Sequence, residues 1–196
     1  ISGIRFATTR LVSEELGRNN PAGIKAAVRN GMLYALGFGM AACLGLFFGA
    51  EYIGTRWIRD TRTILSLRIL ALSLPCFALS AVLAGYFTAV TRVIKSAAVS
   101  IAEQLIRIGT VVAALTVSTG YTLETACAIV VAGGVVGEIA SFIMLYVLYL
   151  FDRRRYTFRK VSSRGVMRRL LGIAVPLALS AYARSALSTL ENLLVP

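Results

Sequence analysis

Charged side chains occur at only a few places inside the long apolar runs of this sequence, and these are the residues that could do chemistry. Arg184 lies near the middle of the run 170–195, two helical turns before Glu191 and one turn from Ser180 and Ser188. A guanidinium is permanently charged and has several N–H donors, so Arg184, Ser188 and Glu191 form a candidate binding site for an anionic group such as a phosphate. The alternative is a structural ion pair with a carboxylate on another helix.

Two other apolar runs contain carboxylates. Glu103 and Arg107 are four residues apart, so on a helix they share a face and are expected to form a structural ion pair. Glu138 has no charged neighbour in its run and follows three glycines between positions 133 and 137. Because an ionisable residue at membrane depth is costly, Glu138 is a candidate ion-coupling site for a proton or sodium. The alternative is a pair with an arginine elsewhere.

The elements that must position these residues are membrane-spanning helices. The chain is 57% hydrophobic and 15% charged, compared with about 25% charged residues in a typical soluble domain. Residues 69–91 carry no charge and rise about 34 Å as a helix, enough to cross a hydrocarbon core of about 30 Å. We expect an all-α, polytopic transmembrane helix bundle, and residues 1–20 are expected to be the cytoplasmic, water-facing end of a preceding helix. The five complete spans are expected at 30–50, 69–91, 93–117, 125–151 and 170–195.

Local signals mark where the helices begin and how they pack. Asn20 is a candidate N-cap, and Pro21 suits the first helical position. Small residues occur at four-residue spacing in the first span and predict a close helix contact there, although glycine is also simply common in membrane helices. These small residues are Gly31, Ala35, Gly45 and Gly49.

The formal charge of +12 arises from 21 Lys and Arg against 9 Asp and Glu. In a soluble protein it would suggest nucleic-acid binding, but here the basic residues gather at the ends of the apolar runs. If the spans cross the membrane alternately up and down, one side of the membrane carries 15 Lys and Arg residues. The other side carries four, all within 56–68. The richer side is therefore predicted to be cytoplasmic. Anionic lipid headgroups are the expected partners of Arg153, Arg154 and Arg155, and no nucleic acid is expected.

Metal and cofactor chemistry is not expected. The chain has no histidine, and its three cysteines, Cys43, Cys76 and Cys127, are isolated in apolar runs. There is no phosphate-binding loop of the G-x-x-x-x-G-K-[ST] type. Because the chain opens at Ile1 without a signal-peptide pattern and ends directly after an apolar run, we expect it to be an internal piece of a longer protein.

Four stretches carry a family resemblance: TTRLVSEELGRNNP, RILALSLPCFALSAVLAGYFTAVTRV, AEQLIRI and PLALSAYARSALSTLENLLVP. They resemble the stage V sporulation protein B type of polysaccharide-biosynthesis membrane protein. This type belongs to the multidrug/oligosaccharidyl-lipid/polysaccharide exporter superfamily, which includes the lipid II flippases. The resemblance implies two lobes of six helices around a central cavity. Residues 1–151 would then be part of the first lobe, 152–169 the basic cytoplasmic connection, and 170–196 the first helix of the second lobe, with Arg184 in the cavity.

The function that the resemblance implies is a flippase or exporter. It would move a lipid-linked oligosaccharide or peptidoglycan precursor across the bacterial cytoplasmic membrane by alternating access, in cell-wall or spore-cortex synthesis. A cation-coupled multidrug exporter of the same fold is the first alternative. A membrane enzyme or assembly scaffold in envelope polysaccharide synthesis is the second, although an enzyme is not expected because loop carboxylates are few and scattered. The remaining helices of the full-length transporter would be its partners.

Overall fold

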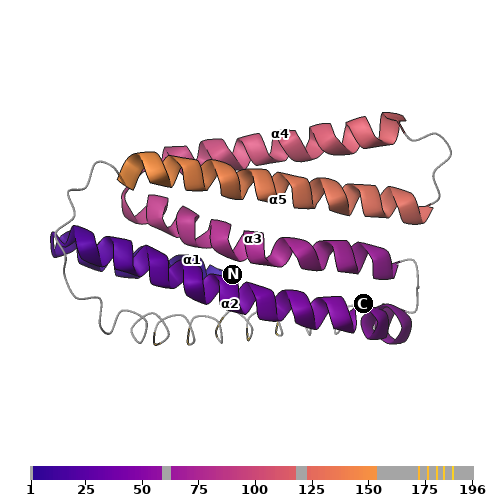
Figure 1. The fold of residues 1–196 in the computed structure, drawn as a ribbon, viewed down its shortest axis with the longest axis horizontal. Helices are drawn as coiled ribbons and strands as arrows, with labels where there is room; N and C mark the ends of the chain where they lie inside the picture. Colours follow the sequence, from indigo (N-terminus) through magenta and orange to yellow (C-terminus); the bar gives the residue numbers. More distant parts are fainter. Residues whose placement is uncertain are drawn as a thin grey trace.

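The computed structural model describes residues 2–58, 63–117 and 123–153, together with five single residues between 172 and 187. Every secondary-structure element in this part of the chain is a helix, as the sequence predicts (Figure 1). The elements in chain order are α1 (Ser2–Gly17), α2 (Pro21–Tyr52), the short π-helix η1 (Ile53–Ile58), α3 (Thr63–Ala89), α4 (Val93–Val117) and α5 (Leu123–Arg153).

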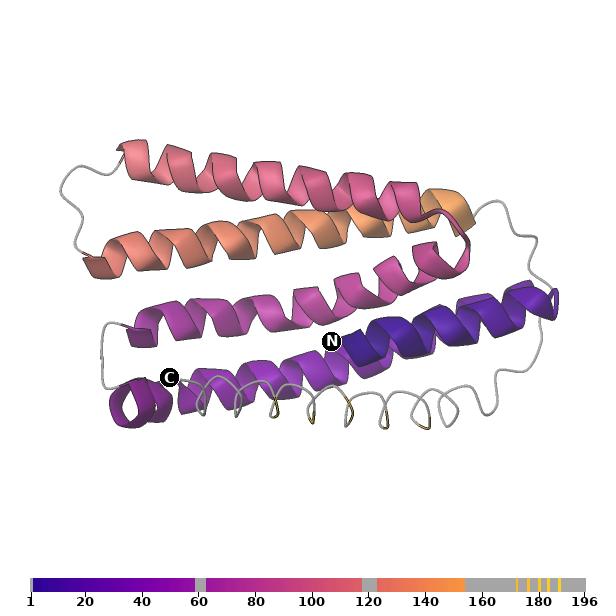
Figure 2. The same cartoon turned by 180° about the vertical axis from the view of Figure 1, so that it is seen from behind.

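Helix α3 lies at the centre of the bundle. Helices α1 and α2 pack on one side of it, α5 packs on the other, and α4 lies beyond α5 with its main contact on that helix (Figure 1). Seen from behind, α1 runs beside the first half of α2 (Figure 2). The core therefore lies around the second half of α3, where Leu83, Tyr86 and Phe87 are almost fully buried.

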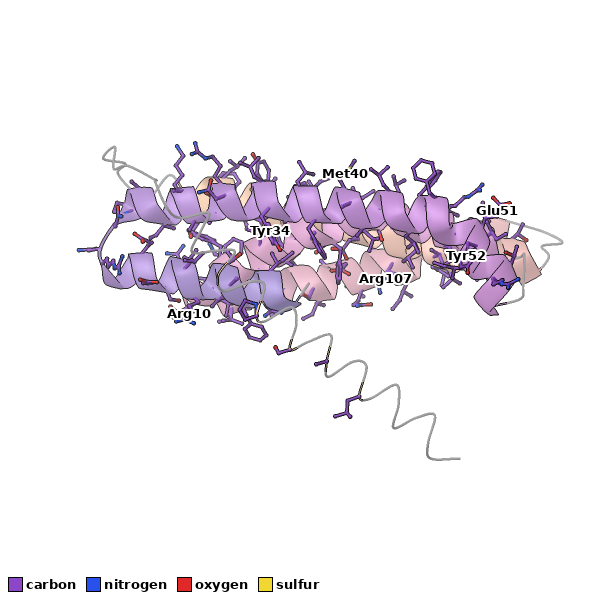
Figure 3. All side chains as sticks on the ribbon, turned by 90° about the horizontal axis from the view of Figure 1, so that it is seen from below. Arg10, Tyr34, Met40, Glu51, Tyr52 and Arg107 are labelled. Atoms are coloured by element: carbon purple, nitrogen blue, oxygen red, sulfur yellow. The ribbon has the colours of Figure 1, made fainter. Side chains whose placement is uncertain are left out.

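Four helices are long and apolar enough to cross a membrane, at Pro21–Arg56, Thr63–Ala89, Val93–Thr116 and Thr125–Asp152. They locate four of the five expected spans, and the fifth, 170–195, is described only at the five single residues noted above. In Figure 3 Arg10 lies toward one end of the bundle and Glu51 and Tyr52 at the other, with Met40 and Arg107 between them. Large apolar side chains remain exposed along the outer helix faces, as expected for surfaces in contact with lipid. The protein is a multi-pass membrane protein.

The turn between α1 and α2 follows its sequence signals. Asn19 has a φ of 54° and ends α1 in a left-handed cap, in which the Asn20 N–H donates to Glu15 O (3.0 Å) and the Asn19 N–H to Leu16 O (3.0 Å). The Asn20 side chain then accepts from the Gly23 N–H (3.2 Å) and caps α2, whose first residue is Pro21. The predicted cap is confirmed. Although α1 was expected at the water-facing end of a helix, its apolar side is covered, with Ala7 and Val12 fully buried.

The turn between α3 and α4 has the same cap geometry. Thr91 has a φ of 57°, the Arg92 N–H donates to Phe87 O (2.9 Å) and the Thr91 N–H to Thr88 O (3.2 Å). This turn presents Arg92 to Asp152 near the end of α5, and the two side chains form an ion pair. Lys95 adds a second ion pair to Asp152 at 3.5 Å.

The carboxylate of Asp152 is only 1% exposed and also accepts a hydrogen bond from the Tyr86 hydroxyl (3.0 Å). We call Tyr86, Arg92, Lys95 and Asp152 the Asp152 cluster. The sequence assigned Asp152 to the basic connection, but α5 continues through Arg153. Asp152 therefore belongs to the bundle, because it fastens the end of α5 to the α3–α4 turn.

Helices approach one another closely at several glycines. Of the four small residues that the sequence indicated in the first span, only two are buried in such a contact. Gly31 and Ala35 are buried, whereas no atom outside the local helix lies near Gly45, and the nearest one to Gly49 belongs to Ile53. The stripe therefore ends halfway along α2, beyond which this face of the helix is open. Helix α1 approaches α3 closely at Gly85, whose carbonyl accepts a hydrogen bond from the Thr9 hydroxyl (3.1 Å).

The connection between the first two expected spans, 30–50 and 69–91, is shorter in the structure than their bounds suggest. Helix α2 runs to Tyr52, η1 follows directly, and α3 begins at Thr63. The polar and aromatic residues that the structure describes in this segment therefore lie on helical backbone.

Candidate functional site

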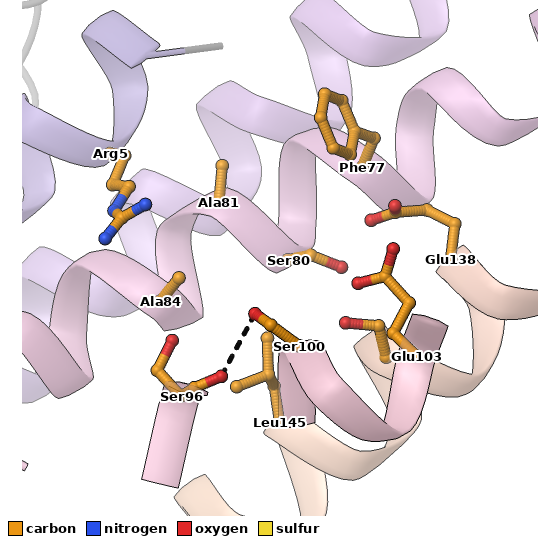
Figure 4. Close-up of a pocket in the computed structure, with 11 residues that line it drawn as sticks. Arg5, Phe77, Ser80, Ala81, Ala84, Ser96, Ser100, Glu103, Glu138 and Leu145 are labelled. Carbon is orange, nitrogen blue, oxygen red and sulfur yellow. Dashed lines mark hydrogen bonds between the residues drawn. The ribbon is translucent and has the colours of Figure 1, made fainter. Parts of the chain in front are cut away.

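A polar pocket lies inside the membrane-spanning part of the bundle, between α1, α3, α4 and α5. Its volume is about 290 Å³. Glu103 from α4 and Glu138 from α5 line one end of it, Ser80 from α3 lies between them and the middle, and Arg5 from α1 lies toward the opposite end (Figure 4). The pocket thus combines two carboxylates, a guanidinium and several serine hydroxyls among apolar helices.

The depth of the two carboxylates follows from their places along the helices. Glu138 is the central residue of α5, about 22 Å from either end at about 1.5 Å per residue. Glu103 lies about 15 Å from the beginning of α4 on the same basis. Both are too deep to reach the interface by bending their side chains outward.

Glu103 forms the ion pair that its spacing predicts. Its Oε1 accepts a hydrogen bond from Arg107 Nη2 at 3.0 Å, and its side chain is 15% exposed. The Arg107 guanidinium is not fully satisfied, because its Nε is buried without a hydrogen-bond partner. The pair is confirmed, but it borders the pocket and is not sealed within the packing of α4 against α5.

Glu138 is 6% exposed and forms no ion pair with any residue that the structure describes. The Ser80 hydroxyl, on a residue that is 7% exposed, lies close to this carboxylate but makes no hydrogen bond of ordinary geometry. The expected alternative, an arginine paired with Glu138, is therefore not found in the described segments. Glu138 instead faces the cavity that Glu103 shares.

Two glycines bring the carboxylates together. A Cβ at Gly137 would lie 3.3 Å from both Glu103 O and Arg107 Cβ, and one at Gly133 would lie 3.4 Å from Arg107 O. Since no other residue type leaves this space, α5 can approach α4 closely at the level of Glu103. The glycines that the sequence showed before Glu138 therefore serve the α4–α5 contact.

The other residues singled out in the sequence are not brought into this pocket by the described structure. Arg184, Ser188 and Glu191 lie outside the described residues, as do Arg154 and Arg155. Arg153 is the last residue of α5. The candidate anion site in 170–195 therefore stays a prediction.

Sequence reasoning missed most members of the pocket, among them Arg5, Ser80 and Ser141. The serines give no periodic signal, because single serines are ordinary in membrane helices. Arg5 was counted as a residue setting the orientation of the protein. Only the packing of α1 and α5 on α3 brings these residues together.

The pocket is suited to a small cation. No cluster of three or more His, Cys, Asp or Glu side chains occurs in the described part of the chain, so a site for a transition metal or a multidentate divalent cation is not formed there. Carboxylate and hydroxyl oxygens are hard ligands and also accept protons. A cavity of this size lies at the lower limit of about 300–1,000 Å³ for organic ligands, so it holds an ion and water better than a sugar lipid.

Comparison with known proteins identifies the family. The family model described as polysaccharide biosynthesis protein matches residues 2–195. The chain belongs to this polysaccharide biosynthesis protein family. It is also similar to stage V sporulation protein B of Bacillus subtilis (strain 168), with 28% identity over 138 residues, which cover 68% of this chain and 26% of the relative.

The chain thus spans about a quarter of the length of that curated relative. No solved structure matches the chain. The family and the four membrane-spanning helices establish a multi-pass bacterial membrane protein. The resemblance noted in the sequence is confirmed at the level of the family.

Proposed function

We propose that this protein is part of a flippase or exporter that moves a lipid-linked oligosaccharide or peptidoglycan precursor across the bacterial cytoplasmic membrane by alternating access. The observation that supports it most is the match to a polysaccharide biosynthesis family over residues 2–195 of a chain built from membrane-spanning helices. A buried polar pocket in the bundle adds support, since charged groups at membrane depth mark ion and substrate pathways.

In this proposal the lipid-linked sugar does not bind in the described pocket. The helices up to the end of α5 at Arg153 would form part of one lobe, the connection would follow, and 170–196 would open the second lobe. Arg184, with Ser188 and Glu191, would hold the anionic headgroup between the lobes, while the lipid tail stays in the bilayer. Glu138 would serve as the ion-coupling residue.

A cation-coupled multidrug exporter is the second candidate, and the carboxylate pair with Phe77 beside it favours that function. Against it, the pocket is small for an amphipathic drug and also contains Arg5.

We propose that the protein transports and does not catalyse a covalent reaction. An enzyme or scaffold function would show as covalent turnover of a labelled lipid-linked donor, or as assembly without movement.

The test uses the full-length natural protein in liposomes that contain a fluorescent lipid-linked oligosaccharide. Movement between leaflets is followed by the fraction of label that a membrane-impermeant quencher reaches. We expect wild-type protein to make the whole pool accessible and Arg184→Ala to slow this at least about tenfold, the effect of losing one charged hydrogen-bonding partner. Arg164→Ala, in the expected connection, is the matched control.

Three results would contradict the proposal. Unchanged sugar-lipid movement in Arg184→Ala would remove the role of that residue. Transport of a cationic dye that survives this substitution, without sugar-lipid movement, would favour the drug exporter. Covalent conversion of the labelled donor would establish an enzyme.

A further inference from the structure

The turn between α3 and α4 carries more positive than negative charge. Arg92 and Lys95 both form ion pairs with Oδ1 of Asp152, Lys95 at 3.5 Å, and the other carboxylate oxygen accepts the hydrogen bond from Tyr86. Two cations therefore share one carboxylate, and both oxygens of that carboxylate already have partners. The Asp152 cluster is left with a surplus of one positive charge.

The other carboxylates of the described helices do not balance this surplus. Helix α3 contains no Asp or Glu, and Glu103 of α4 lies about 12 Å farther along its helix, where it pairs with an arginine of that helix. In α5, Glu138 lies about 21 Å before the cluster. Glu14 and Glu15 of α1 form ion pairs with Arg18. A second anion for the cluster must therefore come from outside the described residues.

The two cations are open to the surface on one side. The side chains of Arg92 and Lys95 are 32% and 38% exposed, whereas Asp152 behind them is 1% exposed. One Nη of Arg92 bonds to Asp152, and neither its Nε nor its other Nη is buried without a partner. A guanidinium has five N–H donors and an ammonium has three, so both keep donors for another anion. Because Asp152 already holds both side chains in place, binding that anion costs little side-chain entropy.

Exposed apolar side chains beside the cations indicate which kind of anion fits. Ile94 lies between Arg92 and Lys95 in the sequence and is 85% exposed, and its neighbour Val93 is 49% exposed. The turn joins two membrane-spanning helices, one ending at Ala89 and the next beginning at Val93, so it lies at the bilayer surface. It lies beside the end of α5, at the end of the bundle that the sequence predicts to be cytoplasmic (Figure 1). Lipid headgroups of the cytoplasmic leaflet carry negative charge, and their acyl chains would cover the apolar pair.

We propose that Arg92 and Lys95 bind the phosphate of one anionic phospholipid of the cytoplasmic leaflet, while Ile94 contacts its acyl chains. A phosphodiester carries one negative charge and accepts several hydrogen bonds, so the two cations then face two anions, Asp152 and the phosphate. A zwitterionic lipid brings its own cation and gains less. The pyrophosphate of a lipid-linked sugar carries more negative charge than this site can balance. Buried Asp152 fixes the geometry of the site, which separates it from the expected headgroup contacts at 153–155.

The test measures lipid binding to the full-length protein in a nonionic detergent and does not depend on transport. Native mass spectrometry gives the fraction of protein that carries one lipid as phosphatidylglycerol is added, and phosphatidylcholine is added in a parallel titration. We expect phosphatidylglycerol to bind at least about fivefold more tightly, the effect of one cation near an anionic headgroup. Inorganic phosphate at equal ionic strength should not displace it, because it has no acyl chains.

Three variants separate the charge from the apolar contact. Lys95→Gln should weaken phosphatidylglycerol binding about fivefold and leave phosphatidylcholine binding almost unchanged, because one cation is lost. Ile94→Ser changes no charge and should weaken binding of both lipids about fourfold, the effect of one methylene contact with an acyl chain. Arg68→Gln is the matched control and should leave both affinities unchanged. It removes a 45% exposed arginine from the other end of α3, where a single carboxylate, Glu51, already balances the charge.

A purely structural cluster would behave differently. Lys95→Gln and Arg92→Gln would then lower the melting temperature but bind phosphatidylglycerol as wild type does, and this result would overturn the proposal. Displacement of the lipid by inorganic phosphate would overturn it in favour of a soluble anion. Tighter binding of a lipid-linked oligosaccharide than of phosphatidylglycerol, lost in Lys95→Gln, would assign these residues to the transported lipid instead. If Arg92→Gln is not monodisperse, because Asp152 loses a partner, the surface substitutions Lys95→Gln and Ile94→Ser decide.

Discussion

The Asp152 cluster provides a sharp test of how the bundle is held together. Asp152→Asn keeps the size of the side chain but removes the charge that Arg92 and Lys95 share. Breaking a buried ion pair from one side costs about 3–5 kcal/mol when both partners are buried. Here the carboxylate is 1% exposed, while Arg92 and Lys95 are 32% and 38% exposed, so water recovers part of the cost. We expect a loss of about 2–3 kcal/mol.

The assay is reversible unfolding of the full-length protein in mixed micelles, followed by helical circular dichroism. The matched control is Glu51→Gln, whose ion pair with Arg68 is long at 3.8 Å and exposed on both sides, at 74% and 45%. Such a pair contributes about 0–1 kcal/mol, so the control should unfold almost as wild type does.

A second comparison separates the pair from general damage. If Asp152 acts through Arg92, the double variant Asp152→Asn/Arg92→Gln should be less destabilised than the sum of the two single variants. A loss below about 0.5 kcal/mol in Asp152→Asn, the range of ordinary surface substitutions, would refute the reasoning. Full additivity in the double variant would refute the pairing.

Further predictions concern backbone contacts and are checked by the same unfolding assay. Gly85→Ala should destabilise the protein by about 1–3 kcal/mol, because the new Cβ would lie 2.7 Å from Arg5 O. Gly45→Ala has open space around it and should be neutral or stabilising by up to about 1 kcal/mol. Equal effects of the two would show that the α1–α3 contact is misplaced. Thr91→Asn should stabilise the protein by about 0.5–1 kcal/mol, because Thr91 has a positive φ that asparagine tolerates better, as Asn19 does in the equivalent cap. A loss of stability would contradict the cap geometry. Gly137→Val should destabilise by about 1–3 kcal/mol, because its side chain would press α4 away from α5, and an unaltered free energy of unfolding would contradict the role of this contact.

Much of the fold was predictable because it depends on local chemistry. Apolar runs long enough to span a membrane located α2 to α5, and the expected span 93–117 coincides with α4. The Asn20 and Pro21 signals gave the beginning of α2 because capping involves only neighbouring residues. The Glu103–Arg107 pair was predictable for the same reason, as one turn of helix joins the two side chains.

The composition of the pocket was not predictable, because it depends on which faces of distant helices meet. Glu138 could be recognised as unusual from its own run, but its neighbour Glu103 lies 35 positions earlier, and nothing in either run sets the register between them. Asp152 was missed in the same way, since Arg92 lies 60 residues away. The one available signal was the pair of glycines at 133 and 137, which indicated a close contact without naming the partner helix.

The central claim is that a cation bound at Glu138 drives movement of a lipid-linked sugar, and one measurement tests it directly. Liposomes with the full-length protein and the fluorescent sugar lipid are given an inward or outward gradient of sodium or, in a separate experiment, of protons. The account predicts that the gradient accelerates movement in wild type and in Glu51→Gln, and that Glu138→Gln moves the lipid only at the rate seen without a gradient. A gradient response in Glu138→Gln equal to that of wild type would contradict the claim.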